Sequence, residues 1–256
     1  AGAAMVIAGL IAEGTTIIEN AAEEPEVVDL ANFLNSMGAN VRGAGTKVIK
    51  IEGVEKLHGT NYTVIPDRIE AGSYLIAAAI TGGNLLLKNV IADHIKPVIA
   101  KLQECGMEIV EEDNNLRIIG HEPVKAVDIK TLPYPGFPTD MQAQFMALMS
   151  VAKGTSVFTE TIFENRFMHI PELKRMGANI RILNSHTVLI RGVSELSGAT
   201  VMSSDLRGGV GLVLAALAAK GESIIQRIYH IDRGYYQLEN KLQQLGADIQ
   251  RINLPD

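Results

Sequence analysis

Three aspartates, Asp67, Asp140 and Asp205, each stand just before a long apolar stretch that has the composition of a buried helix. A carboxylate at a helix N-terminus accepts hydrogen bonds from free backbone N–H groups and interacts favourably with the helix dipole. Each aspartate is therefore either a structural cap or a reacting group. If the three helices are related by an internal repeat, their N-termini converge on one face, and that face attracts anions.

The surroundings of Asp140 are the most distinctive of the three. The segment Tyr134–Gln144 is rich in proline, which fixes φ and interrupts a regular ladder. Thr139 and Gln142 then have the spacing of a capping box, which predicts that a helix begins here. Residues 141–152 carry no charge, so we expect this helix to be buried on every side.

Arg207 stands two residues after Asp205, at the predicted start of another apolar helix. A positive charge is unfavourable at this end of a helix dipole. Its presence is better explained if it faces a phosphate or a carboxylate, because the guanidinium group binds both with two parallel hydrogen bonds.

Two polar loops occupy equivalent junctions between a predicted strand and a predicted helix. The first contains Glu164, Arg166 and His169, and the second contains Asp232 and Arg233. Loops on a rigid scaffold commonly carry binding residues. The alternative is that the charged residues form local ion pairs, which are common on protein surfaces. The histidines of these loops lack the spacing of a metal site, and a histidine with satisfied hydrogen bonds is the simpler interpretation.

A repeat of about 70 residues organises the elements that must position these residues. An apolar helix is followed by a glycine and a β-like run at four places, around Gly14, Gly83, Gly154 and Gly221. An amphipathic helix and another strand follow each time. These second helices are expected to end at Gly38, Gly106, Gly177 and Gly246, since glycine readily takes the left-handed conformation that terminates helices.

The repeat predicts an α/β (α+β) fold built from βαβαββ units. Fully apolar helices must point inward, so we expect a lobe of buried parallel helices with sheets and amphipathic helices outside, an inside-out α/β barrel. The last repeat is expected to stop after its second helix and strand. Further strands are predicted at 47–52, 62–65, 116–119, 126–129, 187–190 and 199–202.

Composition restricts the class of protein. The 256 residues are enough for one large domain or two small ones with a sizeable core. The net charge of −6 and the lack of a Lys/Arg run argue against a nucleic-acid-binding protein. One cysteine, Cys105, excludes an internal disulfide framework and suits the cytoplasm. The uncharged runs are too short for a membrane span, and no signal peptide is evident.

Several sequence runs together resemble a known family. They are FPTDMQAQ at 137–144, FENRFMH at 163–169, DLR at 205–207 and HIDRGY at 230–235. In this order they resemble the UDP-N-acetylglucosamine 1-carboxyvinyltransferases, a family of enolpyruvyl transferases. The resemblance covers the whole chain, including EGTTIIEN at 13–20 and PDRIE at 66–70. It implies that residues 1–64 are the last repeat of a first lobe. Residues 65–256 would then be a second lobe of three repeats that lacks its N-terminal strand.

The resemblance also implies a reaction, the transfer of an enolpyruvyl group from phosphoenolpyruvate to the sugar 3-hydroxyl of UDP-N-acetylglucosamine. This step opens peptidoglycan synthesis and needs no cofactor or metal. Asp140 would be the acid–base residue, while Arg207 and Arg233 would hold the carboxylate and phosphate of phosphoenolpyruvate. Ile162 would lie against the nucleotide. The substrate-binding residues implied in this way are Asp140, Ile162, Glu164, Arg166, Asp205, Arg207 and Arg233.

Other features of the resembled family have no matching positions. Its lysine–asparagine pair near the N-terminus, its mobile loop with a cysteine and several first-lobe arginines have no counterpart, and Cys105 ends a predicted amphipathic helix instead. Because half of the cleft is unmatched, we expect this chain alone to be inactive. The alternatives are a non-catalytic module that binds nucleotide sugars or anions or docks onto a complementary first lobe, and an inert repeat scaffold.

Overall fold

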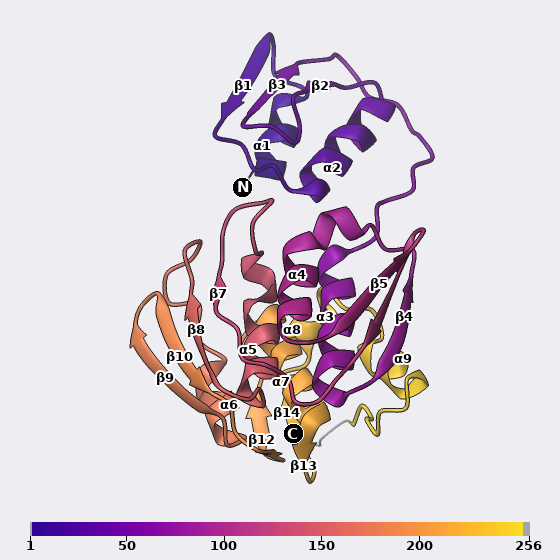
Figure 1. Ribbon diagram of the computed structural model, residues 1–256. Helices are drawn as coiled ribbons and strands as arrows, with labels where there is room; N and C mark the ends of the chain where they lie inside the picture. Colours follow the sequence, from indigo (N-terminus) through magenta and orange to yellow (C-terminus); the bar gives the residue numbers. More distant parts are fainter. Residues whose placement is uncertain (1, 253–256) are drawn as a thin grey trace. The chain divides into compact units, whose positions relative to one another are not determined.

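The computed structural model describes residues 2–252, with side chains described from Val6 onward. The chain forms two compact units (Figure 1). The N-terminal unit comprises the residues up to Asp67 together with Leu132–Phe137, and the C-terminal unit comprises Arg68–Thr131 and the residues from Pro138 onward. The assignment of residues 1–64 and 65–256 to two lobes of a larger protein stays a prediction.

The N-terminal unit is a single repeat with one small sheet. Its elements are α1 (Gly2–Gly9), β1 (Thr15–Glu19), α2 (Pro25–Ser36), β2 (Asn40–Arg42) and β3 (Val48–Glu52). The strands are antiparallel in the order β1-β3-β2. Leu34 of α2 packs with Ile49 and Ile51 of β3 in a core that α1 also covers.

The C-terminal unit contains three further repeats. The first consists of α3 (Arg68–Thr81), β4 (Asn84–Lys88), the 3₁₀ helix η1 (Ala92–Ile95), α4 (Lys96–Glu104), β5 (Glu108–Glu112), β6 (Asn115–Ile119) and β7 (Ile129–Lys130). The second consists of η2 (Thr139–Met141), α5 (Gln142–Ser150), β8 (Thr155–Thr159), α6 (Ile170–Arg175), β9 (Asn179–Asn184), β10 (Thr187–Arg191), β11 (Leu196–Ser197) and β12 (Thr200–Met202). The third consists of α7 (Leu206–Ala218), β13 (Ala219–Lys220), β14 (Ile224–Gln226), α8 (Tyr229–Asp232) and α9 (Leu238–Gln244).

Three apolar helices, α3, α5 and α7, pack against one another in the middle of this unit (Figure 1). Every residue of α5 is buried, as its lack of charge predicts. Close approach of α5 and α7 depends on Gly211, because a Cβ there would lie 2.9 Å from the carbonyl oxygen of Ala143. The predicted buried helix bundle is therefore confirmed.

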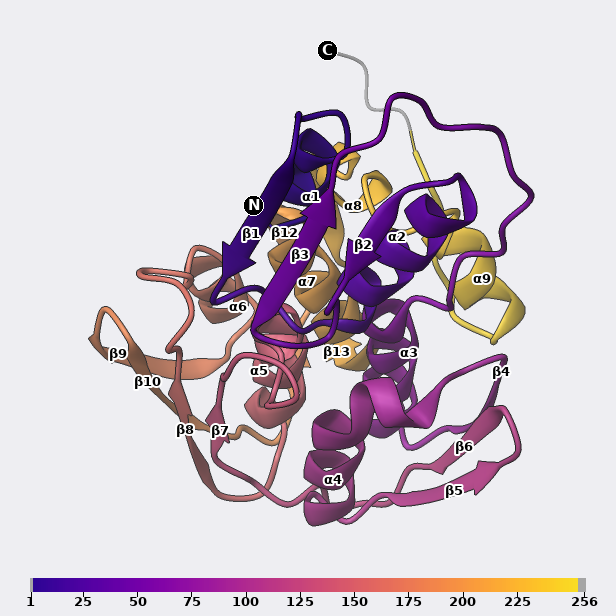
Figure 2. The ribbon, with the colours of Figure 1, turned by 90° about the horizontal axis from the view of Figure 1, so that it is seen from above.

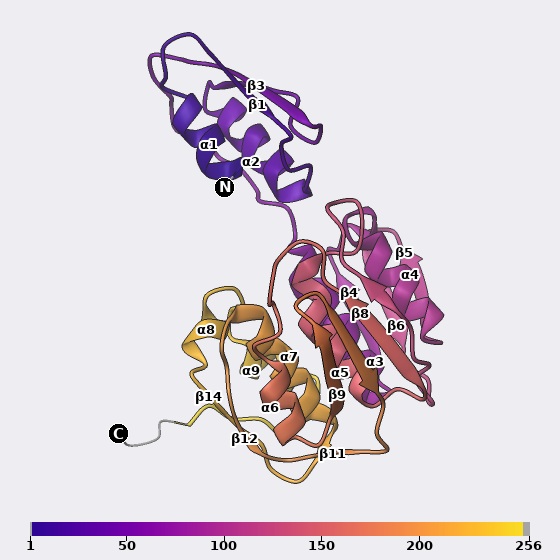
Figure 3. The same ribbon diagram turned by 90° about the vertical axis from the view of Figure 1, so that its left-hand side faces the viewer.

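Sheets cover the outside of the bundle. One has the order β4-β6-β5 and another the order β7-β8-β10-β9, and they lie on different sides of the three helices (Figure 2). Strands at the end of one repeat pair in parallel with strands at the start of the next, as in β7 with β8, β11 with β13 and β12 with β14. The short helix α6 contacts α7 and β12 (Figure 3). This arrangement confirms the predicted α/β fold with helices inside and sheets outside.

The glycines that end the four amphipathic helices behave as the sequence predicts. Gly38, Gly106, Gly177 and Gly246 have φ angles of 95°, 98°, 92° and 97°. These are left-handed values at which a Cβ would be strained. The helix ends are thus set by local sequence.

Three strand predictions differ from the structure. Residues 62–65 do not form a strand, because they have no ladder partner in the described chain, and the Tyr62 hydroxyl donates to the side chain of Asp29 at 2.8 Å. Of the strand predicted at 126–129, only residue 129 lies in a strand, the two-residue β7. At Asp128 the side-chain carboxylate, rather than a backbone carbonyl, accepts the hydrogen bond from the N–H of Val157 at 2.7 Å. The residues described after Gly246 form no strand, and the sheet of β12 and β14 has two strands.

Candidate functional site

Asp140 lies in the short 3₁₀ helix η2 and binds two arginines at once. Its Oδ1 accepts a hydrogen bond from Nη2 of Arg166 at 2.9 Å, and its Oδ2 accepts one from Nη2 of Arg207 at 3.0 Å. Arg166 comes from the loop between β8 and α6, and Arg207 from the first turn of α7. The N-termini of α5 and α7 therefore converge. The Asp140 side chain does not cap α5, so the interpretation of this aspartate as a helix cap is wrong.

The two arginines keep the Asp140 carboxylate ionised. Burial by itself would raise the pKa of Asp140, but the charges of Arg207 and Arg166 outweigh burial and hold the pKa below its ordinary value. The site remains open to solvent, because the side chain of Asp140 is 36% exposed while that of Arg207 is 16% exposed. An anionic ligand can therefore reach both arginines, but it must compete with the carboxylate for them.

Asp205 is a true helix cap. Its Oδ1 accepts hydrogen bonds from the backbone N–H groups of Arg207 at 3.0 Å and Gly208 at 2.9 Å. Burial would raise the pKa of Asp205, but hydrogen bonds from Gly208, Ser204 and Arg207 lower it overall. Asp205 thereby orients the first turn of α7, and with it Arg207, toward Asp140. Asp67 is exposed just before α3.

Tyr235 contacts Arg207 through a different guanidinium nitrogen from the one that binds Asp140. Nη1 of Arg207 donates to the Tyr235 hydroxyl at 3.4 Å, and the guanidinium lies 5.9 Å from the ring centroid. Tyr235 is 1% exposed, and its hydroxyl lies 2.7 Å from Oγ of Ser73 in α3. Nε2 of Gln144 in α5 also donates to Ser73 at 3.4 Å. A buried polar chain thus joins the arginine to all three central helices.

The predicted capping box is wrong, because the side chains of Thr139 and Gln142 donate hydrogen bonds to a buried carboxylate instead of pairing with the helix backbone. The Thr139 hydroxyl donates to Oε2 of Glu160 at 2.8 Å, and the Gln142 amide donates to the same oxygen at 3.0 Å. Glu160 follows β8 and is 1% exposed. Neither Glu160 nor Tyr235 was predicted as a site residue from the sequence. Glu160 is the only charge between Gly154 and Glu164, which is a signal for a buried acid.

The loop after β8 presents a mixed surface. Ile162 and Glu164 are exposed, and Arg166 is half-buried with its guanidinium 4.9 Å from the centroid of the Phe163 ring. Nη1 of Arg166 also donates to the Thr139 hydroxyl at 2.6 Å. The alternative of a local Glu164–Arg166 ion pair is not what the structure shows, since Arg166 pairs with Asp140 instead.

Arg233 is exposed at the C-terminal end of α8. The following Gly234 packs on Leu206, the residue before Arg207, because a Cβ on that glycine would lie 2.8 Å from the leucine side chain. Asp232 binds Arg251 at 3.0 and 2.6 Å rather than Arg233. Within residues 2–252, neither Arg233 nor Glu164 makes a hydrogen bond to Asp140.

A histidine and the cysteine, two residue types that often react, are both buried in the core, at His169 and Cys105. His169 is 3% exposed, with Nε2 3.2 Å from Sδ of Met146, and burial lowers its pKa to about 4. It is therefore a neutral core residue rather than a polar loop residue. Cys105 is fully buried at the end of α4, where burial raises the pKa of its thiol to about 12 and makes it unreactive. In the described part of the chain, no three side chains of the types that ligate metals come together, and no helix is long and apolar enough to cross a membrane.

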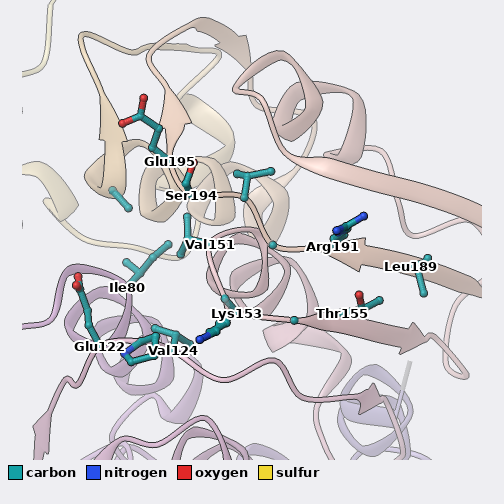
Figure 4. A pocket seen from close by; sticks show the side chains of 16 residues that line it. Ile80, Glu122, Val124, Val151, Lys153, Thr155, Leu189, Arg191, Ser194 and Glu195 are labelled. Carbon is teal, nitrogen blue, oxygen red and sulfur yellow. The ribbon is translucent and has the colours of Figure 1, made fainter.

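A second depression of the C-terminal unit lies at the other end of the bundle (Figure 4). It has a volume of about 1060 Å³ and is lined by Ile80 and Ala218 from the C-terminal ends of α3 and α7, and by Val151, which follows α5. Its charged lining mixes both signs, with Lys153 and Arg191 against Glu122 and Glu195. We assign the site to the Asp140 end, because charged groups converge there at hydrogen-bonding distance.

The sequence matches a known family over most of its length. A model of the family described as EPSP synthase (3-phosphoshikimate 1-carboxyvinyltransferase) matches residues 1–242. UDP-N-acetylglucosamine 1-carboxyvinyltransferase 1 from Caldanaerobacter subterraneus subsp. tengcongensis is 63% identical over 247 residues, which are 96% of this chain and 59% of that protein. The protein of the same name from Halalkalibacterium halodurans is 56% identical over 248 residues, 97% of this chain and 56% of that protein. The chain thus spans less than two thirds of the length of these relatives.

Solved structures agree with this match. The enolpyruvyl transferase NikO from Streptomyces tendae superposes with a TM-score of 0.83 at 27% identity, over 94% of this chain and 58% of that one. EPSP synthase from Acinetobacter baumannii superposes with a TM-score of 0.74 at 22% identity, over 97% of this chain and 60% of that one. The second likeness concerns the fold alone.

Proposed function

The chain belongs to the EPSP synthase (3-phosphoshikimate 1-carboxyvinyltransferase) family, and we propose that it carries part of the active site of an enolpyruvyl transferase. The proposed reaction transfers the enolpyruvyl group of phosphoenolpyruvate to the 3-hydroxyl of UDP-N-acetylglucosamine, at the start of peptidoglycan synthesis. The choice of acceptor is supported by the relatives at 63% and 56% identity, which are named for this nucleotide sugar.

The observation that carries the proposal is the carboxylate of Asp140 between Arg166 and Arg207. In the reaction, the sugar hydroxyl adds to C2 of the enol while C3 takes up a proton. The phosphate then leaves C2 and C3 gives up a proton. Asp140 is ionised, and a carboxylate within hydrogen-bonding distance of the hydroxyl can take its proton. Arg207 offers a guanidinium fork to the carboxylate or phosphate of phosphoenolpyruvate and stabilises the charged intermediate.

The shared arginine links substrate binding to the strength of the base. An incoming anion competes with Asp140 for the guanidinium of Arg207, which lies 3.0 Å from the carboxylate. When this cation is diverted, the influence that most lowers the pKa of Asp140 weakens, and the pKa rises. A carboxylate with a higher pKa is a better proton acceptor. The arrival of phosphoenolpyruvate would therefore activate the base.

The exposed residues around the pair are proposed to meet the substrates. Ile162 and Glu164 lie on the open loop that also carries Arg166, and we assign this loop to the nucleotide sugar. Arg233 is placed beside the first turn of α7 through Gly234 and Leu206, where it can supply a second cation for phosphoenolpyruvate. Asp205 acts by capping α7 and orienting Arg207.

We also propose that this chain by itself does not catalyse enolpyruvyl transfer. It spans 59% of the Caldanaerobacter relative, and the positioning of two substrates needs groups from both sides of the cleft. Binding and catalysis therefore separate in this chain. We expect it to bind the nucleotide sugar weakly through the loop that carries Arg166.

The test is a titration of the isotope-labelled chain with UDP-N-acetylglucosamine, followed by backbone NMR. The amides of Asp140, Ile162 and Arg166 are expected to shift, and Arg166→Gln is expected to weaken the binding about tenfold through the loss of charge-assisted contacts. Arg191→Gln, at the far end of the bundle, should bind like the wild type. Shifts confined to other surfaces, or no shifts at millimolar ligand, would contradict the proposal. Binding without any phosphate release from phosphoenolpyruvate would agree with a binding role for the chain alone.

A further inference from the structure

Glu160 is a buried carboxylate to which the proposed reaction assigns no role. The residue is 1% exposed and accepts hydrogen bonds from five donors. None of the five is a cation. A carboxylate so deeply buried is costly unless its lone pairs are all used, and here they are used by neutral hydroxyl, amide and backbone groups.

The two oxygens of Glu160 serve two different segments. Oε1 accepts from the backbone N–H groups of Ile162 at 2.9 Å and Phe163 at 3.2 Å, and from the hydroxyl of Thr131 at 2.9 Å. Oε2 accepts from the Thr139 hydroxyl and the Gln142 amide, which belong to η2 and α5. One oxygen therefore holds the start of the loop after β8, and the other holds the turn that carries Asp140.

Thr139 extends this connection to the arginine. Its hydroxyl donates to Glu160 at 2.8 Å and accepts from Nη1 of Arg166 at 2.6 Å, so the loop returns to the turn at a second point. The backbone of Glu160 is itself fixed, because its N–H donates to the carbonyl of His186 at 2.8 Å in the connection between β9 and β10. The carboxylate is thus held from the sheet and cannot follow either segment if one moves.

We propose that Glu160 is a positioning residue that sets the separation between Asp140 and the loop that receives the nucleotide sugar. The proposal deepens the proposed function and rests on it, because it gives the loop a fixed distance from the acid–base carboxylate. Reacting groups must be held to within fractions of an ångström for efficient transfer, and such precision comes from surrounding hydrogen bonds.

The donor pattern predicts which replacements are tolerated. In Glu160→Met all five donors lose their acceptor, and the N–H groups of Ile162 and Phe163 cannot turn elsewhere because they belong to the backbone. In Glu160→Gln the amide oxygen can face these two N–H groups. Its NH₂ group then faces Thr139 and Gln142. The Thr139 hydroxyl can rotate and the Gln142 amide can flip, so that the oxygen of each accepts a hydrogen bond from this NH₂ group. Glutamine should therefore restore most of what methionine loses.

A control is available in the same unit. Glu172 in α6 is also largely buried, with a side chain 18% exposed, and its Oε2 accepts from the backbone N–H of Met202 at 3.0 Å. Glu172→Met removes a partly buried acceptor from a backbone donor away from Asp140, together with an ion pair to Arg175 at 3.6 Å. It separates a general loss of stability from a loss of position at the site.

The experiment measures amide hydrogen exchange and UDP-N-acetylglucosamine affinity in the 256-residue chain. In Glu160→Met, exchange at Ile162 and Phe163 should accelerate at least about tenfold and affinity should fall about tenfold or more, while Glu160→Gln stays within about threefold of wild type. Glu172→Met should leave both quantities at the site within about twofold. The proposal is overturned if Glu160→Met exchanges and binds like the wild type, or if Glu172→Met has the same effects.

If Glu160→Met does not fold, Thr139→Val removes one of the two donors to Oε2, together with the hydrogen bond that Thr139 accepts from Arg166. It should weaken binding about threefold with protection of Ile162 and Phe163 intact, and unchanged binding or a loss of that protection would overturn the proposal. If the wild-type chain does not bind the nucleotide sugar, the proposed function fails at this step. The exchange rates of Ile162 and Phe163 in the Glu160 variants then still decide whether Glu160 holds the loop.

Discussion

The pairing of Asp140 with two arginines predicts how the Asp140→Asn variant behaves. Asparagine keeps the size of the side chain but has one oxygen, so it can accept from Arg166 or from Arg207 and turns an NH₂ toward the other guanidinium. The variant therefore weakens two contacts, at 2.9 and 3.0 Å, and removes the negative charge that lies between two neighbouring cations.

The size of the effect follows from the exposure of the three side chains. Removing one partner of a fully buried pair costs about 3–5 kcal/mol, whereas an exposed pair contributes about 0.2–1 kcal/mol. Here the side chains are 36%, 24% and 16% exposed for Asp140, Arg166 and Arg207, so solvent screens part of the interaction. We expect the free energy of unfolding of the C-terminal unit to fall by about 1.5 kcal/mol.

The same substitution should improve the binding of anions. Asp140 competes with any anion for Arg207, and its removal should raise the affinity for inorganic phosphate about tenfold, which corresponds to about 1.4 kcal/mol. Urea denaturation without phosphate measures the loss of stability, and calorimetric titration with phosphate measures the gain in affinity. Phosphate should also restore stability to the variant more than to the wild type.

The control for this experiment is Asp93→Asn. Asp93 pairs with Lys96 at 2.6 Å on the surface, with side chains 74% and 66% exposed. Its substitution should leave both the free energy of unfolding and the phosphate affinity close to those of the wild type, because solvent screens an exposed ion pair. The reasoning is refuted if Asp140→Asn is as stable as the wild type and binds phosphate no better.

Three other predictions concern groups around the site. Burial lowers the pKa of His169 to about 4 from an ordinary 6.5, so only the unfolded chain takes up this proton between those values. Stability should therefore fall as pH drops from 6.5 to 4, by about 3 kcal/mol, and denaturation curves of His169→Gln should lack this loss. Tyr235→Phe keeps the ring over Arg207 but removes the hydroxyl. It should lower the free energy of unfolding by about 1 kcal/mol in urea, and no change would show that the hydroxyl contributes nothing. Gly211→Val forces α5 and α7 apart and should cost about 2–3 kcal/mol, and a wild-type melting temperature would contradict the packing described.

The sequence predicted those features that depend on residues close together in the chain. The absence of charge in residues 141–152 predicted the burial of α5, and glycine predicted the left-handed end after α2 at Gly38. Both follow from the chemistry of a few adjacent residues. The same is true of Asp205, whose side chain caps the helix that begins one residue later.

Other features depend on partners that are distant in sequence. The capping box at Thr139 failed because Glu160, 21 residues away, offers a better acceptor to its hydroxyl. Residues 62–65 have a strand-like composition, but no neighbouring strand among residues 2–252 completes a ladder with them. Local ion pairs were a reasonable alternative for Arg166, yet its partner Asp140 lies 26 residues away on another element. These pairings follow from the fold rather than from any local pattern.

The most direct test of the proposed reaction is phosphate release by a chimera in which this chain replaces the matching part of the Caldanaerobacter relative. The chimera supplies the rest of the cleft, and its release of phosphate from phosphoenolpyruvate should depend on UDP-N-acetylglucosamine. We predict that Asp140→Ala lowers this rate about 100-fold or more in a folded chimera, as expected for the loss of an acid–base group. A chimera that releases phosphate equally well with and without Asp140 would contradict the role of this residue.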